Sequence, residues 1–442
     1  MTAKYLTWKQ PRKVVNANIM QEVLDKVDAC QLKDWNTSLK PRLHKESEFD
    51  VAQRSTYLRV DLQAIWNNIQ ILKSKCANHT KVIAVVKGNA YGHGSVGVAR
   101  HLSQCGVTHF AVATSLEGKE LRQNGVTGFI QVLGSCVTEE MDTMLEENLT
   151  PTVSDVNFIK IWAEKIKTKH EENIDSCDQV YQKFCVVVKV DSGMSRNGCQ
   201  CEDLPKLMKA CAEHKVAVHS LMTHFAQAWD DPVFTQQQLA TFLDAVQPYR
   251  KTGVKVHVAN SAAIIRGFGT HLDFVRPGIA IYGLPPDSSL QSACIVKSLG
   301  LKPALTWVAR PSLVKTLEAG RSVGYDQMYK LLKPETLATF SFGYADGYNR
   351  LLSGRGVLTD TKANQYEVVG RVSMDAVTVI VDDNVTRDTV FHVITDDYQS
   401  PNCVANMAAV LGTIPYEVAT SLAARLPRLY VTNQQCVGRG TH

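Results

Sequence analysis

Short apolar runs rich in β-branched residues alternate with longer amphipathic segments from about residue 56 to 284. In the amphipathic segments, such as 202–214 and 234–251, apolar residues recur at helical spacing, whereas the short runs are typical of buried strands. Eight strands are predicted, at 81–87, 109–114, 128–134, 150–155, 185–193, 217–225, 254–261 and 274–284. This order predicts an α/β fold, a (β/α)8 TIM-type barrel whose active site lies at the carboxyl ends of the strands. A doubly wound open sheet is the alternative, but no GxGxxG follows the first strand.

The pattern changes after residue 284. Runs such as TLATFSFGYAD and TVFHVITDD alternate in polarity and are rich in β-branched residues, without long helical windows. A second, mainly β C-terminal domain is therefore predicted at 291–442, with its boundary in the loop PPDSSLQSA. The barrel is assigned to 56–290, and residues 1–55 to an N-terminal extension of unknown role with one predicted helix at 17–30.

Composition narrows the possible functions. The chain has 442 residues and no apolar run of bilayer-spanning length, so no membrane segment is predicted. Its net charge of +5 is scattered, so it gives no reason to expect a nucleic-acid partner, and a small anionic substrate or cofactor fits it equally well. The twelve cysteines form no CxxC pair, so reduced thiols are expected and no metal site. The basic N-terminus lacks an apolar signal core, so the cytoplasm is the expected location and a mitochondrial presequence the alternative.

A lysine closes the first predicted strand, in AVVKGNAYGHG at 84–94. Burying an ammonium group is costly unless its pKa falls or the nitrogen becomes covalently bound. Lys87 is therefore a candidate for Schiff-base chemistry, and a lysine that emerges into solvent at the strand end is the alternative.

The same stretch resembles the signature of the alanine racemases, fold-type III enzymes that use pyridoxal 5'-phosphate (PLP), which is written AVVKANAYGHG. Gly88 stands where the family usually has alanine, and the resemblance continues over roughly residues 56–430. It implies that Lys87 carries PLP as a Schiff base and acts as one of two proton-transfer bases. It also implies that the Tyr91 hydroxyl donates to the PLP phosphate.

Further cofactor-binding residues are implied by the motifs THFA, HVANSAA, VRPGIAIYGL, KVDSGMSRNG and TIPYEV. They are His224 and Arg276 by the ring, Ser261, Tyr416 and the backbone of Gly278 and Ile279 by the phosphate, and Arg196 by the phenolate oxygen. Because an arginine donates without giving up its proton, Arg276 would leave the ring nitrogen unprotonated and favour return of the proton to Cα over transamination. Lys189 is either carbamylated, as it often is in the family, or an ordinary salt-bridged lysine.

The second base must approach the opposite face of the substrate Cα. The family uses a tyrosine from the partner subunit in a motif like VGYG, which makes Tyr325 in VGYD the candidate. The motifs GYADGYNR and GRVSMDA imply Tyr344 and Met374, with Arg196, as substrate-binding residues. Since the β-domain residues, Tyr416 among them, would have to reach the barrel of another chain, a homodimer with shared active sites is expected.

Three residues depart from the family pattern on the substrate side, namely Trp229, Ser373 and Pro415. The resemblance implies racemisation of L- and D-alanine by a two-base mechanism, with a small amino acid as substrate. A broader-specificity or serine racemase would share nearly all of these motifs. A decarboxylase of the same fold generally places a carboxylate at the ring nitrogen, which Arg276 argues against, and a PLP-carrier protein would lack the β domain.

Overall fold

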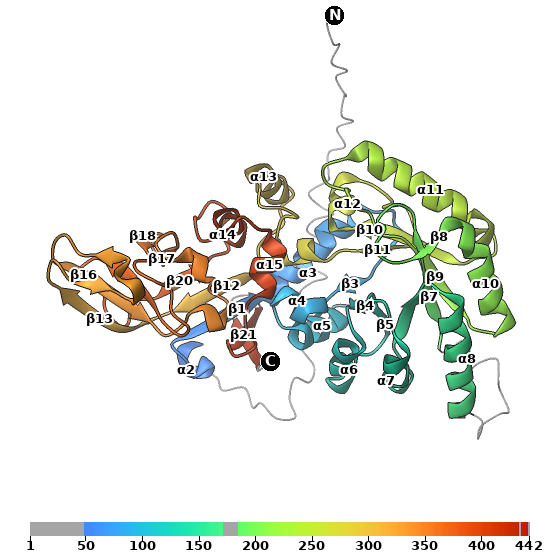
Figure 1. Ribbon diagram of the computed structural model, residues 1–442, viewed down its shortest axis with the longest axis horizontal. Helices are drawn as coiled ribbons and strands as arrows, with labels where there is room; N and C mark the ends of the chain where they lie inside the picture. The colour runs from blue at the N-terminus through green and yellow to red at the C-terminus, as the bar shows by residue number, and fades with distance from the viewer. Residues whose placement is uncertain (1–47, 171–183, 433–434, 441–442) are drawn as a thin grey trace, which may run out of the picture. The chain divides into compact units, whose positions relative to one another are not determined.

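Nine segments of a ten-stranded parallel sheet close into a barrel (Figure 1), and the tenth strand, β8 (Cys199–Gln200), lies off this ring. The computed structural model describes residues 48–170, 184–432 and 435–440, so the helix predicted at 17–30 lies outside the described residues. The order is β2 (Lys81–Val82), β11 (Phe274–Arg276), β10 (Lys255–Asn260), β9 (Val218–Met222), β7 (Val186–Asp191), β6 (Thr150–Val153), β5 (Phe129–Val132), β4 (His109–Val112) and β3 (Ala84–Val85). Only Ile83 separates β2 from β3, so they are two halves of one strand and the ring has eight strands. The predicted (β/α)8 barrel is confirmed.

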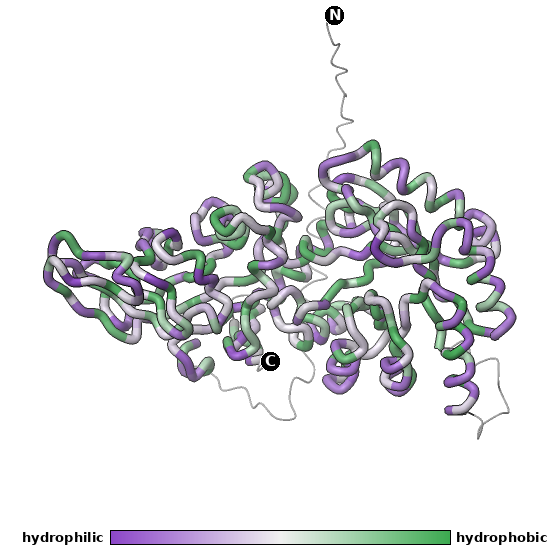
Figure 2. The backbone as a smooth tube through the Cα atoms, viewed as in Figure 1, coloured by the Kyte–Doolittle hydropathy of each residue, from purple (hydrophilic) through white to green (hydrophobic). Residues whose placement is uncertain are grey.

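Helices surround this barrel, and their polar residues alternate with apolar ones along the tube (Figures 1 and 2). They include α5 (Ser95–Gln104), α6 (Ser115–Gln123), α7 (Met141–Glu146), α8 (Val156–His170), α10 (Leu204–Glu213), α11 (Pro232–Arg250) and α12 (Ser261–Arg266). The helices predicted at 202–214 and 234–251 are thus present as α10 and α11. None of the helices in the described ranges is long and apolar enough to cross a membrane.

The eighth strand is shorter than predicted. It ends at Arg276, and the rest of the run at 274–284 forms the 3-10 helix η3 (Ile279–Tyr282). Pro277 has no N–H to donate to a neighbouring strand, and Gly278 begins the turn, so the apolar pattern continues while the strand does not.

A second sheet of seven strands takes six of them from the C-terminal region, which confirms a mainly β domain. Its order is β18 (Gln365–Glu367), β17 (Val357–Asp360), β20 (Phe391–Ile394), β12 (Leu305–Ala309), β1 (Thr56–Asp61), β21 (Arg428–Thr432) and β22 (Gln435–Gly440). Strand β1, which the sequence analysis assigned to the barrel region, pairs antiparallel with β12 and parallel with β21. Its local pattern does not reveal which sheet it joins, because that depends on pairing with residues far along the chain. The other domain boundaries stay predictions.

Smaller elements complete this part of the molecule. A three-stranded sheet contains β13 (Pro311–Leu317), β16 (Glu335–Phe340) and β19 (Val377–Val381), and β14 (Ser322–Val323) pairs with β15 (Tyr329–Lys330). The helices are α13 (Leu290–Ser298), α14 (Val404–Leu411) and α15 (Pro415–Thr420), and α2 (Glu48–Ala52) precedes β1. One hydrophobic cluster runs from the barrel strands into the seven-stranded sheet, so the two parts share a core.

A buried arginine joins the two parts. Arg428 on β21 is fully buried, and its guanidinium donates to four carbonyl groups. These belong to Gly92 (3.0 Å), Leu422 (3.1 Å), Ala423 (3.2 Å) and Leu426 (2.9 Å). Gly92 follows the segment that carries Lys87, so Arg428 ties the second sheet to that segment.

Replacing Arg428 with Met should lower the free energy of unfolding by at least about 3 kcal/mol, because each buried carbonyl left without a donor costs about 1–3 kcal/mol. Urea unfolding of the full chain measures this. The matched control is Arg387→Met, at an exposed arginine, where a change within about 0.5 kcal/mol is expected. Equal losses of unfolding free energy in the two variants would contradict the proposal that Arg428 ties the second sheet to the segment that carries Lys87.

Candidate active site

Lys87 begins a left-handed helical turn at the carboxyl end of β3. In this segment, α4 (Lys87–Tyr91), the φ angles of Gly88, Asn89, Ala90 and Tyr91 are 62°, 53°, 52° and 52°. A left-handed turn costs an L-residue about 1–2 kcal/mol, and only glycine adopts it freely. Successive residues in this conformation persist only where the surroundings hold them, which is typical of functional sites.

Side chains from the barrel hold the turn in place. The Glu117 carboxylate accepts hydrogen bonds from the Gly88 N–H (2.7 Å) and the Ala113 N–H (2.6 Å). Glu117 also completes the capping box of α6, so one carboxylate fixes both a helix end and the lysine turn. The Asn89 side chain accepts from the Ser95 N–H (2.8 Å) at the start of α5.

The second domain closes over the turn from the other side. A Cβ placed on Gly92 would lie 2.0 Å from the Ala419 carbonyl oxygen of α15, so only glycine fits there. His93 is buried and its Nδ1 lies 2.9 Å from the Tyr91 carbonyl oxygen, while its ring stacks on Tyr282 at 4.4 Å. The α4 segment is therefore packed between barrel and β domain, and the amine of Lys87 starts from a fixed backbone.

The surroundings of Lys87 favour its neutral amine. Burial lowers its pKa below the ordinary value, and the positive charges of Arg196 and Arg276 lower it further, against the opposing effect of Glu117. A lysine of lowered pKa is a better nucleophile at neutral pH. The arrangement therefore fits an amine that forms a covalent bond with a carbonyl group.

Hydroxyl groups gather beside this lysine. The Tyr91 ring lies 5.9 Å from that of Tyr416, and a Cβ on Gly278 would meet the Tyr91 hydroxyl at 2.4 Å. Ser261 Oγ accepts from the Gly278 N–H (2.9 Å) and the Ala280 N–H (3.2 Å), so its own proton is left to donate. Within the described ranges neither the Tyr91 nor the Tyr416 hydroxyl has a hydrogen-bond partner, and such a set of donors suits a phosphate group.

Tyr416 lies beside Tyr91 of its own chain. The expectation that Tyr416 reaches the barrel of another chain is therefore wrong. The physical reason is the packing of α15 on α4, where Ala419 lies against Gly92 and Thr420 Cγ2 would stand 3.4 Å from a Cβ on Gly88. The predicted proximity of Tyr416 to Tyr91 is an arrangement that one chain makes by itself.

Arg276 is buried, and no acidic side chain in the described part of the chain pairs with it. Its guanidinium donates to the Thr223 carbonyl (2.7 Å), to the Val258 carbonyl (3.0 Å) and to His257 Nδ1 (2.6 Å), with His224 Nδ1 at 3.5 Å. Burial lowers the pKa of Arg276 to about 9, which leaves it protonated at neutral pH. Burial and Arg276 hold the pKa values of both histidines well below the ordinary range, so neutral imidazoles accept from the arginine.

Lys189 and Arg196 come from β7 and the loop after it. Lys189 is buried, its amine donates to Asn197 Oδ1, and burial with Arg196 and Arg276 lowers its pKa to about 8. Asp191 does not pair with this lysine in the described structure. Its carboxylate instead accepts the N–H groups of the three residues from 193 to 195, at 3.0 Å each, and so shapes the loop that carries Arg196.

The remaining predicted residues lie on the surface of the second domain. Tyr325, Tyr344 and Met374 are 70%, 42% and 53% exposed. The loops of Tyr344 and Met374 are joined, because the Ala345 N–H donates to the Met374 carbonyl (3.1 Å) and the Tyr344 N–H donates to the Ser373 carbonyl (3.1 Å). No hydrogen bond, ion pair or ring contact in the described part of the chain links these three side chains to Lys87. The structure thus divides the predicted site into two parts. The lysine cluster contains Lys87, Tyr91, Lys189, Arg196, His224, Ser261, Arg276 and Tyr416, and the exposed β-domain face contains Tyr325, Tyr344 and Met374.

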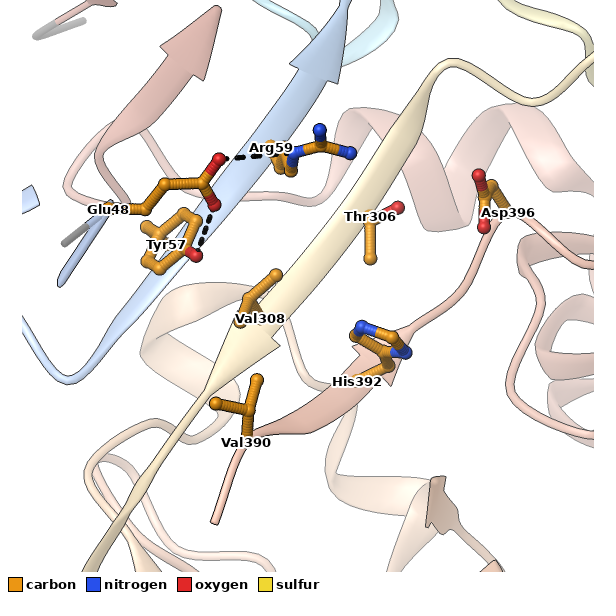
Figure 3. A pocket seen from close by; sticks show the side chains of 8 residues that line it. All are labelled: Glu48, Tyr57, Arg59, Thr306, Val308, Val390, His392 and Asp396. Atoms are coloured by element: carbon orange, nitrogen blue, oxygen red, sulfur yellow. Dashed lines mark hydrogen bonds and ion pairs between the residues drawn. The ribbon is translucent and has the colours of Figure 1, made fainter. Parts of the chain in front are cut away.

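A cleft of about 350 Å³ lies elsewhere, on β1, β12 and β20 (Figure 3). On one side, Glu48 accepts from the Tyr57 hydroxyl (2.6 Å) and from Arg59 Nε (3.3 Å). Thr306, Val308, Val390, His392 and Asp396 complete its lining. None of the predicted site residues lines it, so this cleft is separate from the lysine cluster.

Two family models match the chain, "Alanine racemase, N-terminal domain" over residues 60–286 and "Alanine racemase, C-terminal domain" over 304–430. The chain belongs to the alanine racemase family. It is 34% identical over 385 residues to an alanine racemase of Carboxydothermus hydrogenoformans, covering 86% of this chain and 100% of that one. To alanine racemase 2 of Oceanobacillus iheyensis it is 34% identical over 391 residues, or 87% of this chain and 95% of the relative.

Solved structures of this family have the same fold. Alanine racemase of Clostridium difficile 630 superposes with a TM-score of 0.78 at 29% identity, covering 88% of this chain and 98% of that one. An alanine racemase from Bartonella henselae, described with covalently bound pyridoxal phosphate, has a TM-score of 0.72 at 28% identity and covers 85% and 99% of the two chains.

Sequence reasoning missed three residues that shape the cluster, Glu117, Asn197 and His257. Glu117 stands three residues after Thr114, and this capping-box spacing is a signal that the sequence does contain. The contacts of Asn197 with Lys189 and of His257 with Arg276 depend on how strands pack and have no local signal.

Buried histidines near the turn predict how stability depends on pH. Burial lowers the pKa values of His93 and His101 to about 4, from an ordinary value near 6.5. Both are neutral in the folded chain but take up protons in the unfolded chain as the pH falls below about 6.5. The free energy of unfolding should therefore fall between about pH 6.5 and 4, by up to about 1.4 kcal/mol per pH unit for each histidine.

Urea unfolding at a series of pH values checks this, with His101→Leu as the test variant and His79→Leu, at an exposed histidine, as the control. His101→Leu should make the decline shallower, and His79→Leu should not. Identical slopes in both variants would show that His101 does not contribute.

Proposed function

We propose that the chain racemises L- and D-alanine with PLP bound covalently through Lys87. The observation that carries the proposal is the Lys87 amine, which stands on a strained turn with a lowered pKa, next to hydroxyl groups whose arrangement suits a phosphate. Full-length relatives named alanine racemase, and one described with covalently bound pyridoxal phosphate, support it. When bound, PLP supplies the electron sink that makes the α-proton of an amino acid acidic.

The residues of the lysine cluster fit this cofactor. The hydroxyls of Tyr91, Ser261 and Tyr416, with the backbone of Gly278 and Ile279, would hold the phosphate at the end of β11. Arg276 would donate to the ring nitrogen while His257 and the backbone hold its other N–H groups. The remaining contacts are His224 beside the ring and Arg196 at the phenolate oxygen and the substrate carboxylate.

Lys87 and Tyr325 would be the two bases. Inversion needs one group that removes the α-proton and another that delivers a proton on the opposite face. Lys87 serves one face from the barrel, and Tyr325 would serve the other from the partner subunit of a homodimer, with Tyr344 and Met374 binding the substrate beside it. The exposure of these three side chains leaves them accessible to a second chain.

Lys87→Ala should abolish covalent attachment of PLP and lower kcat at least about a thousandfold, because a positioned acid–base group is worth about 10²–10⁴-fold. Borohydride reduction followed by peptide mass spectrometry locates the cofactor, and chiral chromatography follows turnover. Lys209→Ala, at an exposed lysine of α10, is the control. Full turnover in the Lys87 variant would refute the assignment.

Tyr325→Phe should slow exchange of the α-proton of one enantiomer more than that of the other, since it removes the base from one face only. The measurement is deuterium uptake from D2O into each pure enantiomer of alanine, starting from either side. Tyr329→Phe removes a nearby hydroxyl that donates to Glu335 and is the matched control. Equal residual exchange rates for the two enantiomers would exclude Tyr325 as a face-specific base.

The alternatives separate in one assay of the PLP-loaded enzyme with single enantiomers of alanine, serine and lysine. Racemisation with α-deuterium uptake supports the proposal, and the ranking of substrates distinguishes an alanine racemase from a serine or broader-specificity enzyme. Release of CO2 would indicate a decarboxylase, and bound PLP without turnover a carrier protein. We propose the cytoplasm as the location of the chain.

A further inference from the structure

A chain of hydrogen bonds leads from Arg276 into the interior of the barrel. Arg276 Nη1 lies 2.6 Å from His257 Nδ1, His257 Nε2 lies 3.0 Å from Ser220 Oγ, and Ser220 Oγ lies 3.0 Å from His219 Nδ1. The first three side chains are almost fully buried. Strands β11, β10 and β9 thus each contribute to one continuous polar path.

An irregularity in β9 turns two neighbouring side chains into the same space. Val186 pairs with Val218 and Val187 pairs with Ser220, so β9 has one extra residue there, His219. In a regular strand consecutive side chains point to opposite faces, and a bulge changes that direction. The His219 ring stacks on Phe129 at 4.1 Å, beside Phe274 at 5.5 Å. Phe129 and Phe274 begin β5 and β11, so His219 lies at the end of the barrel opposite Lys87.

The direction of donation is fixed at the Arg276 end of the path. Arg276 can only donate, so His257 Nδ1 accepts and a neutral His257 carries its proton on Nε2. That N–H donates to Ser220 Oγ, and the serine proton in turn donates to His219 Nδ1. Burial keeps the pKa of His257 well below its ordinary value and lowers that of His219 to about 4, so both rings are neutral.

The groups around His219 do not stabilise a charged ring. His109 of β4 lies 6.3 Å away between ring centroids, and its pKa is lowered by burial and by Lys81 of β2. Phe129, Phe274 and His257 face it from β5, β11 and β10, and among the described residues no carboxylate raises its pKa. The path therefore has one arrangement of protons at neutral pH.

We propose that Ser220 and His219 are positioning residues that hold His257 in the tautomer required to accept from Arg276. The inference rests on the proposed function, in which Arg276 meets the ring nitrogen of PLP. Without the serine hydroxyl, the buried Nε2–H of His257 has no acceptor, so the tautomer that accepts from Arg276 loses stability relative to the Nδ1–H tautomer, which opposes the Arg276 N–H and turns the guanidinium. Through Arg276, a residue at the far end of the barrel then influences the cofactor ring.

Four full-length variants test this role. Ser220→Ala removes the bridging hydroxyl, and His219→Leu removes the final acceptor. His219→Asn restores an acceptor at the position of Nδ1, so it should rescue the wild-type behaviour. Thr152→Val is the matched control, because it removes another buried hydroxyl from the barrel interior, one that contacts the Val132 carbonyl and Gln131 instead of the path.

The first readout is nitrogen NMR of the PLP-loaded protein labelled at histidine, with the His257 signals assigned by their loss in His257→Gln. Wild type, His219→Asn and Thr152→Val should show one protonated and one unprotonated ring nitrogen. Ser220→Ala and His219→Leu should show averaged shifts from two tautomers. The second readout is steady-state racemisation, where these two variants should lose about five- to tenfold in kcat, the worth of about one hydrogen bond, with KM changed less than about twofold.

The experiments distinguish failure of the positioning role from failure of the proposed racemase function. A Ser220→Ala/His219→Leu double variant should lose no more kcat than either single variant, because both interrupt one path. If Ser220→Ala matches Thr152→Val in both the His257 signals and kcat, the positioning role is wrong while the racemase assignment stands. A wild type that does not racemise refutes the proposed function, and the His257 signals still report whether Ser220 and His219 set the tautomer.

Discussion

The left-handed turn that follows β3 is the constraint on which the lysine cluster depends. Four consecutive residues with positive φ cannot be stable by themselves, so neighbouring elements must supply the free energy that keeps them there. Glu117 binds the turn from the barrel, and α15 closes over Gly92 from the second domain. Because Arg428 also binds the Gly92 carbonyl, the geometry of the barrel's lysine depends on the β domain of the same chain.

Positive charge dominates the interior of this cluster. Lys87, Lys189, Arg196 and Arg276 act on one another, and each of the two lysines has its pKa lowered by burial and by both arginines. Such an arrangement repels a proton from the Lys87 amine and attracts an anion, which a phosphate and a substrate carboxylate both are. The positive charge of these side chains therefore favours both a neutral Lys87 amine and the binding of anionic groups. Neutral His224 and His257 accept from Arg276 without cancelling its charge.

The barrel was predictable because short runs rich in apolar and β-branched residues alternate regularly with segments of helical periodicity. Strand β1 was not, since its six residues, Thr56–Asp61, match either sheet and only distant pairing decides between them. The motif at 84–94 identified Lys87, but nothing in Ala90 or Tyr91 indicates a left-handed backbone. Likewise, His219 is the extra residue of β9. Its position in the barrel depends on how β9 pairs with Val186 and Val187, which the local sequence does not show. Local patterns thus predicted elements and chemical groups, and the packing between strands determined how those groups are held.

The division of the predicted site between two surfaces follows from the geometry of inversion. Two bases on opposite faces of one carbon must approach from opposite directions, and a single strand end cannot present both. The barrel holds Lys87 on a turn fixed at both ends, while Tyr325 stands on a loop where Asp326 pairs with Arg371 at 2.7 Å. Gly370 packs against the Val323 carbonyl in the same region, so this loop is also braced. Each base would then sit on its own rigid frame, and the association of two chains would set the distance between them.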